Sequence, residues 1–228
     1  MASPSIGTLN EGALHAALKD WYARPGDRLE VEVDGYFVDL VRGDLLIEIQ
    51  TGSFAKIKPK LRTLTEAHRL RLVYPVAREK WIVKLDGPGG RRLSRRKSPK
   101  RGQVADVFAE LVSFPRLITR PNFSLDVLLI QEEEERIHVP GKAWRRRGWV
   151  THERRLLEVV GRHTFETGPD LAGLLPAWLP GEFTTADLAA ALPCSRRLAQ
   201  RMAYCLRHAG LLAPVGKRGR AIVYARSE

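Results

Sequence analysis

Cysteine is scarce in this sequence, and long apolar runs are missing. The 228 residues include two cysteines, Cys194 and Cys205, which cannot build a disulfide framework or supply four thiol ligands to zinc. No apolar stretch approaches the roughly 20 residues that cross a bilayer, and Met1 to Thr8 lacks the basic and apolar regions of a secretion signal. We therefore expect a protein of the reducing cytoplasm that has no membrane partner.

Acidic residues are outnumbered as well. The chain has 26 Asp and Glu against 38 Lys and Arg, which gives a formal net charge of +12. Such an excess repels itself and attracts polyanions, among which phosphate backbones are the commonest. It can also serve solubility or attraction to acidic lipid. Because the basic residues cluster, as in the tract over 91–101, nucleic acid is the favoured partner.

The first 90 residues change from a helical to a strand-like apolar period. Asn10 can cap a helix that runs to about Tyr22, and alternation begins at Leu29. The Asp34-Gly35 dipeptide then predicts a tight hairpin. Further predicted elements are strands over 36–42 and 45–50, a helix from Lys58-Pro59, and strands over 70–74 and 80–85. This order of helix, three-strand meander, helix and strands predicts an α/β core over residues 1–90.

The middle of the chain, residues 91–150, is expected to be a basic linker and a mixed α+β region. It holds a probable helix over 104–112, a strand over 125–130 and a second strand that carries Trp144 to Trp149. In a hairpin, Glu132 to Glu135 would face Arg145 to Arg147 and offset their charge. We interpret the tryptophans as core residues with arginines outward, and base stacking is the alternative.

Two carboxylates in the first hairpin carry the main functional signal. A two-residue turn at Gly43-Asp44 places Asp39 directly opposite Glu48, and the preceding turn places Glu30 opposite Asp39. Carboxylates paired in this way repel one another unless a cation such as Mg²⁺ or Mn²⁺ lies between them. The strands around Asp39 and Glu48 are apolar, which favours function over a solvated face. For Glu30 the solvated interpretation is favoured.

The segment Val38-Asp39, eight residues, then Glu48-Ile49-Gln50, resembles the motif of the PD-(D/E)XK nuclease superfamily. The resemblance implies a restriction-endonuclease-like core that hydrolyses phosphodiesters with Mg²⁺ or Mn²⁺. It assigns Asp39 and Glu48 to the metal, with help from the Ile49 carbonyl. It also makes Glu11, on the first helix, an additional candidate ligand.

The motif departs from the family pattern at two positions. Val38 replaces a proline, and Gln50 replaces the usual catalytic lysine. Some restriction endonucleases carry Glu-x-Gln and remain active, and in other members a lysine from the next helix takes over. Lys56, Lys58 and Lys60 are the candidates by position, although a lysine in such a place is more often a phosphate contact or a solvated charge.

The C-terminal part, residues 151–228, is expected to be a winged-helix domain. Residues 183–226 resemble a winged helix-turn-helix, with a support helix over 186–192, a recognition helix over 195–208 and a basic wing turn at 216–220. The candidate nucleic-acid contacts are Arg196, Arg197, Gln200, Arg201, Lys217, Arg218 and Arg220. Many winged helices bind proteins instead.

These observations predict a metal-dependent DNA endonuclease that acts in repair, recombination or defence. Its substrate would be DNA, branched or damaged, with RNA left open, and a second copy of the chain is compatible as a partner. The rival hypothesis is a non-catalytic DNA-binding protein or regulator that keeps a nuclease-like fold. Gln50 favours the rival, whereas the pair of Asp39 and Glu48 favours the nuclease.

Overall fold

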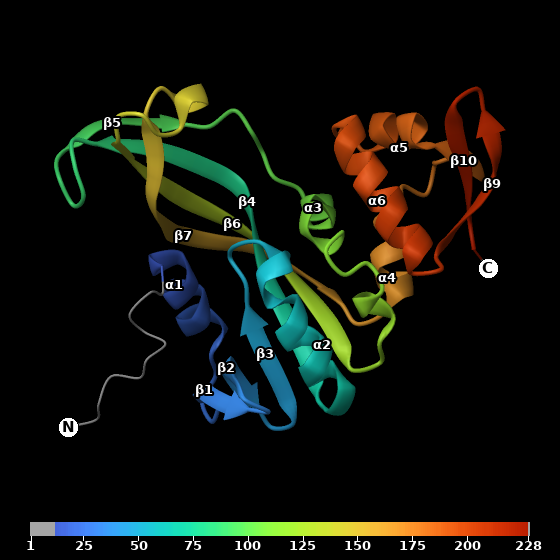
Figure 1. Cartoon of the computed structure of the whole chain (residues 1–228), viewed down its shortest axis with the longest axis horizontal. Coiled ribbons are helices and arrows are strands. Elements are labelled where there is room, and N and C mark those ends of the chain that lie inside the picture. Colours follow the sequence, from blue (N-terminus) through green and yellow to red (C-terminus); the bar gives the residue numbers. More distant parts are fainter. Residues whose placement is uncertain (1–11, 228) are drawn as a thin grey trace.

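The computed structural model describes residues 12–227 and shows a mixed α/β protein (Figure 1). Within those residues a seven-stranded mixed sheet carries helices on both faces, and a three-stranded antiparallel sheet follows near the C-terminus. The predicted N-cap Asn10 and the candidate ligand Glu11 lie outside the described residues. Among the described helices, none is long and apolar enough to cross a membrane.

The first half of the chain supplies most of the large sheet. Its elements are α1 (Ala13–Tyr22), β1 (Arg28–Val33), β2 (Tyr36–Arg42), β3 (Leu45–Ile49), the 3₁₀ turn η2 (Phe54–Ile57), α2 (Lys58–Ala67), β4 (Arg69–Leu85), β5 (Arg92–Lys97), η3 (Val104–Val107) and α3 (Phe108–Leu111).

The second half completes that sheet and then forms the small one. Its elements are η4 (Leu117–Thr119), β6 (Phe123–His138), η5 (Trp144–Arg146), β7 (Trp149–Phe165), α4 (Gly168–Ala172), β8 (Glu182–Thr184), α5 (Thr185–Ala191), α6 (Arg196–His208), β9 (Leu212–Arg218) and β10 (Ala221–Arg226).

The large sheet has the strand order β1-β2-β3-β4-β6-β7, with β5 paired to β4. The first three strands form the predicted antiparallel meander, and α2 carries the chain across to β4, which runs parallel to β3. Strand β6 is also parallel to β4, and β7 returns antiparallel beside β6. The predicted order of helix, meander, helix and strand is therefore confirmed.

The two strands expected over 70–74 and 80–85 are one continuous strand, β4. Pairing with β6 runs along its whole length, with an irregularity between Ala77 and Glu79. Pro75 is tolerated because it lies where β4 has a single neighbour: the pairing with β3 ends at Val73, and the pairing with β5 begins at Trp81. A proline that lacks an N–H costs little on such a free edge.

The middle region is part of the large sheet and is not a linker. Strands β5 and β6 both pair with β4, and β7 crosses the boundary expected at residue 150 and ends at Phe165. Arg154 of β7 lies opposite Glu134 of β6, so the expected pairing of Glu132–Glu135 with Arg145–Arg147 is wrong. Those arginines lie instead in and after the 3₁₀ turn η5, where a strand was expected.

Both faces of the sheet are buried. On one face Leu14, Leu18 and Tyr22 of α1 pack on Leu40, Ile47 and other apolar residues of β2, β3, β4 and β6. The other face lies under α2 and α3, and this core continues without a break into α5 and α6 (Figure 1). The C-terminal helices therefore pack on the large sheet through α3 and η3.

A buried acid anchors α1 to the sheet. Asp126 of β6 is 0% exposed; its Oδ2 accepts a hydrogen bond of 2.5 Å from the Tyr22 hydroxyl and lies 2.6 Å from Nη2 of Arg162. Its other oxygen, Oδ1, has no hydrogen-bond partner. Burial and the Asp126 carboxylate raise the pKa of Tyr22 to about 12, so this tyrosine remains a donor.

Candidate active site

Asp39 and Glu48 lie on neighbouring antiparallel strands, as predicted. The β2–β3 ladder pairs Leu40 with Ile47, and the same register puts Asp39 opposite Glu48 at the point where the ladder ends. At this point the Asp39 carboxylate takes the place of a backbone carbonyl as hydrogen-bond acceptor. Its Oδ2 accepts a hydrogen bond of 2.7 Å from the Ile49 amide. This bond holds the carboxylate of Asp39 at the carboxyl end of β3.

Glu48 points toward the face of the sheet that α2 covers. Its neighbours Ile47 and Ile49 pack against α1, and alternation along β3 directs Glu48 the other way. Its side chain is 8% exposed, and its Oε2 lies 2.5 Å from Nζ of Lys60. Burial and repulsion by Asp39 raise the pKa of Glu48 to about 7, although Lys60 acts in the opposite direction.

Lys60 is the lysine, of the three that the sequence offered, that the fold brings to the carboxylates. Ser53 caps the short turn η2, and Pro59 lies in the first turn of α2, which together start the helix beside the end of β3. Nζ of Lys60 contacts Glu48 and also donates to the Phe37 carbonyl at 2.5 Å. Lys58 instead lines a separate basic pocket, and Lys56 lies in η2.

Gln50 does not face the carboxylate pair. Its Nε2 donates to the Ser53 carbonyl at 3.2 Å, and its Oε1 accepts from the Gly52 amide at 3.4 Å. The Gln50 side chain therefore stabilises the loop that follows β3. The position that carries a lysine in the nuclease motif has a structural role in this chain. A direct catalytic role for Gln50, in place of the usual lysine, is not what this geometry favours.

Two residues of the first helix reach the hairpin. Nε2 of His15 lies 3.1 Å from Oδ1 of Asp39, and Nζ of Lys19 lies 2.8 Å from Oε1 of Glu30. Glu30 lies between the paired residues Leu29 and Val31, across from Asp39, and its carboxylate is paired with Lys19. Sequence analysis missed His15, although a helix places it one turn after Glu11.

Oxygen donors dominate the site. Within residues 12–227 no cluster of three or more His, Cys, Asp or Glu side chains has the geometry of a metal centre. A hard cation at this position would therefore rest on Asp39, Glu48 and oxygens of the backbone or of water. Such a set suits Mg²⁺ or Mn²⁺, which keep several waters and bind proteins through one or two carboxylates.

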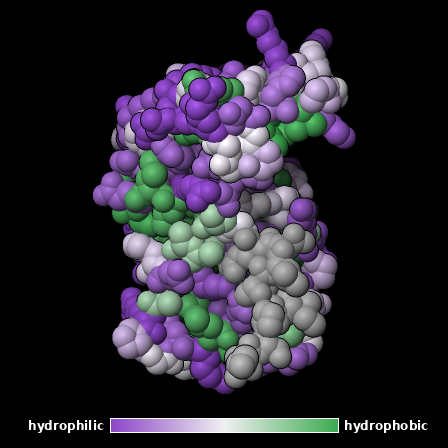
Figure 2. Space-filling model, turned by 90° about the vertical axis from the view of Figure 1, so that its left-hand side faces the viewer, coloured by the Kyte–Doolittle hydropathy of each residue, from purple (hydrophilic) through white to green (hydrophobic). Residues whose placement is uncertain are grey.

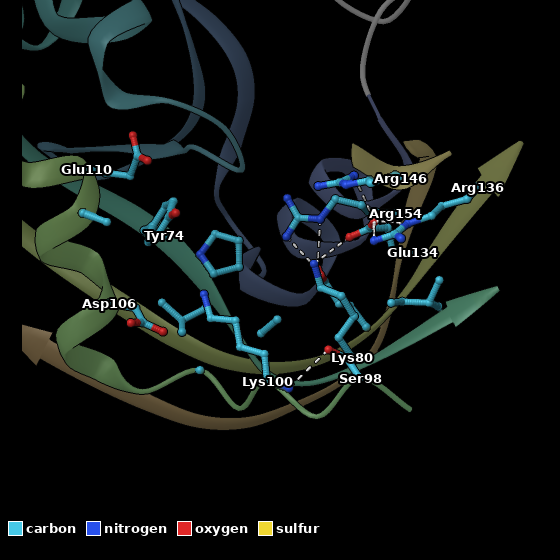
Figure 3. A pocket seen from close by; sticks show the side chains of 17 residues that line it. Tyr74, Lys80, Ser98, Lys100, Asp106, Glu110, Glu134, Arg136, Arg146 and Arg154 are labelled. Carbon is cyan, nitrogen blue, oxygen red and sulfur yellow. Dashed lines mark hydrogen bonds and ion pairs between the residues drawn. The ribbon is translucent and has the colours of Figure 1, made fainter. Parts of the chain in front are cut away.

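Arg154 of β7 connects the hairpin site to a larger polar cavity. Its Nη1 donates to the Thr51 carbonyl at 2.9 Å, just after β3, and its Nη2 lies 2.6 Å from the buried Glu132. The cavity has a volume of about 460 Å³ (Figure 3). In Figure 3 the acids Asp106 and Glu110 lie on one side, and Arg154 lies with Lys80 and Glu134 on the other. Because Arg154 meets these partners only through long-range strand pairing, sequence analysis missed it.

The C-terminal segment forms a helix pair followed by a β-hairpin, near the predicted boundaries. Six of the seven basic and polar candidates are exposed: Arg196, Arg197 and Gln200 on α6, and Lys217, Arg218 and Arg220 at the hairpin. Arg201 differs, because it is partly buried and its Nη1 donates to the Ala109 carbonyl of α3 at 3.2 Å. Arg218 lies 3.4 Å from Asp187. The exposed face of α6 also carries Tyr204 and Arg207.

The fold and site thus define a mixed α/β protein that has a buried Asp–Glu–Lys cluster at one end of a hairpin. A family model described as Domain of unknown function (DUF8091) matches residues 12–166, which cover the large sheet from α1 to β7, and the chain belongs to this family. An uncharacterized protein of Treponema pallidum (strain Nichols) is 33% identical over 226 residues, which span 97% of this chain and 88% of that relative. No solved structure matches the chain significantly.

Proposed function

We propose that this protein is a metal-dependent nuclease of the PD-(D/E)XK type, with a C-terminal winged helix that binds DNA. The observation that carries the proposal is the position of Lys60. The sequence lacks the lysine of the motif, and the chain supplies one from α2, 2.5 Å from Glu48. A structural ion pair would not require Asp39 beside it, since a second carboxylate raises the cost of burying Glu48.

The order of the elements supports the same proposal. Helix α1, the meander β1–β3, helix α2 and strand β4 follow the order of the restriction-endonuclease-like core, and Asp39 and Glu48 occupy the positions of the two motif acids. Glu48 and Ile49 end β3, where the neighbouring ladder to β2 has already stopped. This leaves both carboxylates at the end of the β2–β3 ladder rather than in its middle.

The residues present fit a divalent cation. Two carboxylates of like charge at close range are favourable together only when a cation or a proton offsets one of them. When bound, such an ion would activate a water and offset the charge that develops on the phosphate. Asp39 and Glu48 would hold it, His15 and the Ile49 amide would fix the orientation of Asp39, and Lys60 would keep a positive charge beside the reacting phosphate.

The C-terminal helices would supply most of the affinity for DNA. Arg197, Gln200, Tyr204 and Arg207 form one exposed stripe on α6, with spacings of three and four residues. Tyr204 and the next turn of the helix line a basic pocket of about 410 Å³ together with Lys58 and Arg62 of α2. A DNA strand whose phosphates contact this stripe would therefore also reach α2, the helix that carries Lys60.

Cleavage assays test the proposal. Labelled linear, nicked and branched DNA, and RNA, are incubated with the protein in Mg²⁺, Mn²⁺ or a chelator. We expect cleavage that requires the metal and is lost in Asp39→Asn, with DNA affinity in the chelator unchanged. An Asp44→Asn variant is the matched control, because Asp44 is an exposed acid at the turn of the same hairpin.

The rival function is a DNA-binding protein without catalysis, and the closed loop around Gln50 favours it, because that side chain is not available to the site. Metal-independent DNA binding with no cleavage of any substrate, and no loss of affinity in Asp39→Asn, would establish the rival and exclude the nuclease.

A further inference from the structure

The strands β4, β6 and β7 extend far beyond the end of the meander. Pairing with β3 stops at Val73, yet β4 continues to Leu85 and is joined there by β5. These extensions form an arm (residues 75–97 and 131–160) that projects away from α2 and β1 (Figure 1). The family match includes the whole arm, and the proposed catalytic cluster uses none of its residues.

The acids of the arm are already paired with neighbouring strands. The ion pairs of the run 132–135 are Glu132 with Lys80 and Arg154, Glu133 with Arg95, Glu134 with Lys80, Arg136 and Arg146, and Glu135 with Arg155. Burial raises the pKa of Glu134, but the bonds from Lys80 and Arg136 outweigh it and lower the pKa to about 2. Glu134 therefore stays ionised, and the four carboxylates are occupied by cations of the sheet itself.

A basic cavity lies at the tip of the arm. It has a volume of about 320 Å³ and is lined by Lys84, Arg96, Arg136, Arg145, Arg146, Arg147 and Trp149. Glu134 lies 2.6 Å from Arg136 and 3.8 Å from Arg146. The other four cations have no carboxylate within 4.0 Å among residues 12–227. Cations gathered in this way repel one another, so the cluster costs stability unless an anion binds.

Aromatic rings accompany these cations. Nζ of Lys84 lies 4.2 Å from the centre of the Trp149 ring, and the Arg145 guanidinium lies 5.2 Å from that of Trp144. Trp144 is 81% exposed, so its interpretation as a core residue is wrong. Figure 2 views the molecule from the side of the arm and shows mostly hydrophilic residues, with some hydrophobic ones among them, over the upper part of that face.

The loop that carries Trp144 has a defined shape. The Val139 amide donates to the Gly148 carbonyl at 2.9 Å, and the Arg146 amide donates to the Ala143 carbonyl at 2.7 Å. Gly148 has a positive φ of +84°, and a Cβ there would lie 2.4 Å from the His138 ring, so the loop closes tightly on β6. These backbone bonds therefore fix where the loop presents the tryptophan and its arginines.

We propose that the tip of the arm binds an unpaired nucleic-acid strand, with a phosphate in the basic cavity and a base stacked on Trp144. Arginine forks match phosphate oxygens, and exposed aromatic rings stack on bases that lack a partner strand. The phosphates of a duplex could also bind the arginines, but its paired bases could not stack on the Trp144 ring. This inference takes only the class of partner, nucleic acid, from the proposed function. It does not require that the protein cleaves that partner.

Binding of a labelled oligothymidylate, measured by fluorescence anisotropy in a chelator, tests the inference on the full chain. In Arg145→Gln plus Arg147→Gln, the slope of log affinity against log salt should fall by about 0.7, since both arginines meet the one phosphate in the cavity and each phosphate contact on a single strand contributes roughly 0.7. Arg24→Gln plus Arg28→Gln removes the same charge from exposed positions at the β1 end of the molecule, and its slope should not change.

A second variant tests the stacking. Trp144→Ala should weaken oligothymidylate binding by about tenfold and leave duplex binding unchanged, and Trp144→Phe should keep most of the affinity. Equal losses in the two arginine pairs would overturn the inference, because they would show a general effect of charge. Tighter binding of phosphatidylserine vesicles than of the oligonucleotide, lost in the tip variants, would also overturn it. The binding assays are run in a chelator, where metal-dependent cleavage cannot occur. The binding proposal and the nuclease proposal can therefore fail independently.

Discussion

The buried Glu48 should make the stability of this protein depend on pH in a direction unusual for an acid. Its pKa is raised from 4.5 to about 7 by burial and by Asp39. Between these two values the folded state binds a proton that the unfolded state has released. A group of this kind contributes its full stability below about pH 4.5 and loses it as the pH rises toward 7 and above. Glu48→Gln removes the titration and keeps the shape of the side chain.

The expected magnitude follows from the size of the pKa difference. A change of one unit corresponds to about 1.4 kcal/mol, so between about pH 4 and pH 8 wild type should lose about 3 kcal/mol of unfolding free energy relative to Glu48→Gln. For a chain of this length, 1 kcal/mol moves Tm by roughly 2–4 °C. The Tm difference between the two proteins should therefore change by about 6–12 °C across this range.

Urea unfolding and thermal scans in a chelator, over a series of pH values, measure this difference. Glu66→Gln is the matched control, because Glu66 is an exposed acid on α2, and it should follow wild type at each pH. A constant difference between wild type and Glu48→Gln would refute the reasoning. So would a difference that favours wild type increasingly as the pH rises.

Three further changes test other parts of the account. Lys60→Ala should lower the rate of metal-dependent cleavage by roughly 100-fold or more, as removal of a positioned electrostatic group does, whereas Lys56→Ala, at an exposed lysine of η2, should keep the rate; equal rates in the two variants would contradict the role of Lys60. Arg197→Gln plus Arg207→Gln should lower the salt slope of duplex DNA binding by about 1.8, and an unchanged slope would exclude α6 as the DNA contact. Asp126→Ala should cost about 1–3 kcal/mol in urea unfolding, because it leaves the buried Tyr22 hydroxyl without its hydrogen-bond acceptor; a loss below about 0.5 kcal/mol would contradict that.

The sequence predicts the first hairpin well because its geometry is local. A two-residue turn at Gly43-Asp44 sets the register, and that register alone places Asp39 opposite Glu48. The choice among three lysines was beyond sequence analysis. Neighbouring positions on a helix differ by about a third of a turn, and only the packing of Leu61 and Leu64 against the sheet shows which of them faces Glu48.

The middle of the chain was harder because its contacts are distant in sequence. Pro75 and the polar residues after it interrupt the strand pattern of β4, and the free edge that tolerates them depends on where β3 ends. The pairing of Glu132 with Arg154 depends on the register of two strands joined by a loop, together with three irregularities along β6 and β7. One shifted residue in such a pairing moves every side chain to the other face.

The central claim is that Asp39 and Glu48 form one site for a divalent cation. Calorimetric titration with Mn²⁺ at about pH 6.5, repeated in buffers of different ionisation enthalpy, tests it most directly, because a metal that binds Glu48 must displace the proton held by its raised pKa. We predict one site in wild type and in Lys58→Ala, with release of a large fraction of one proton that declines above about pH 7. Glu48→Gln should show neither the site nor the release. Mn²⁺ binding of equal affinity and equal proton release in wild type and Glu48→Gln would contradict the account.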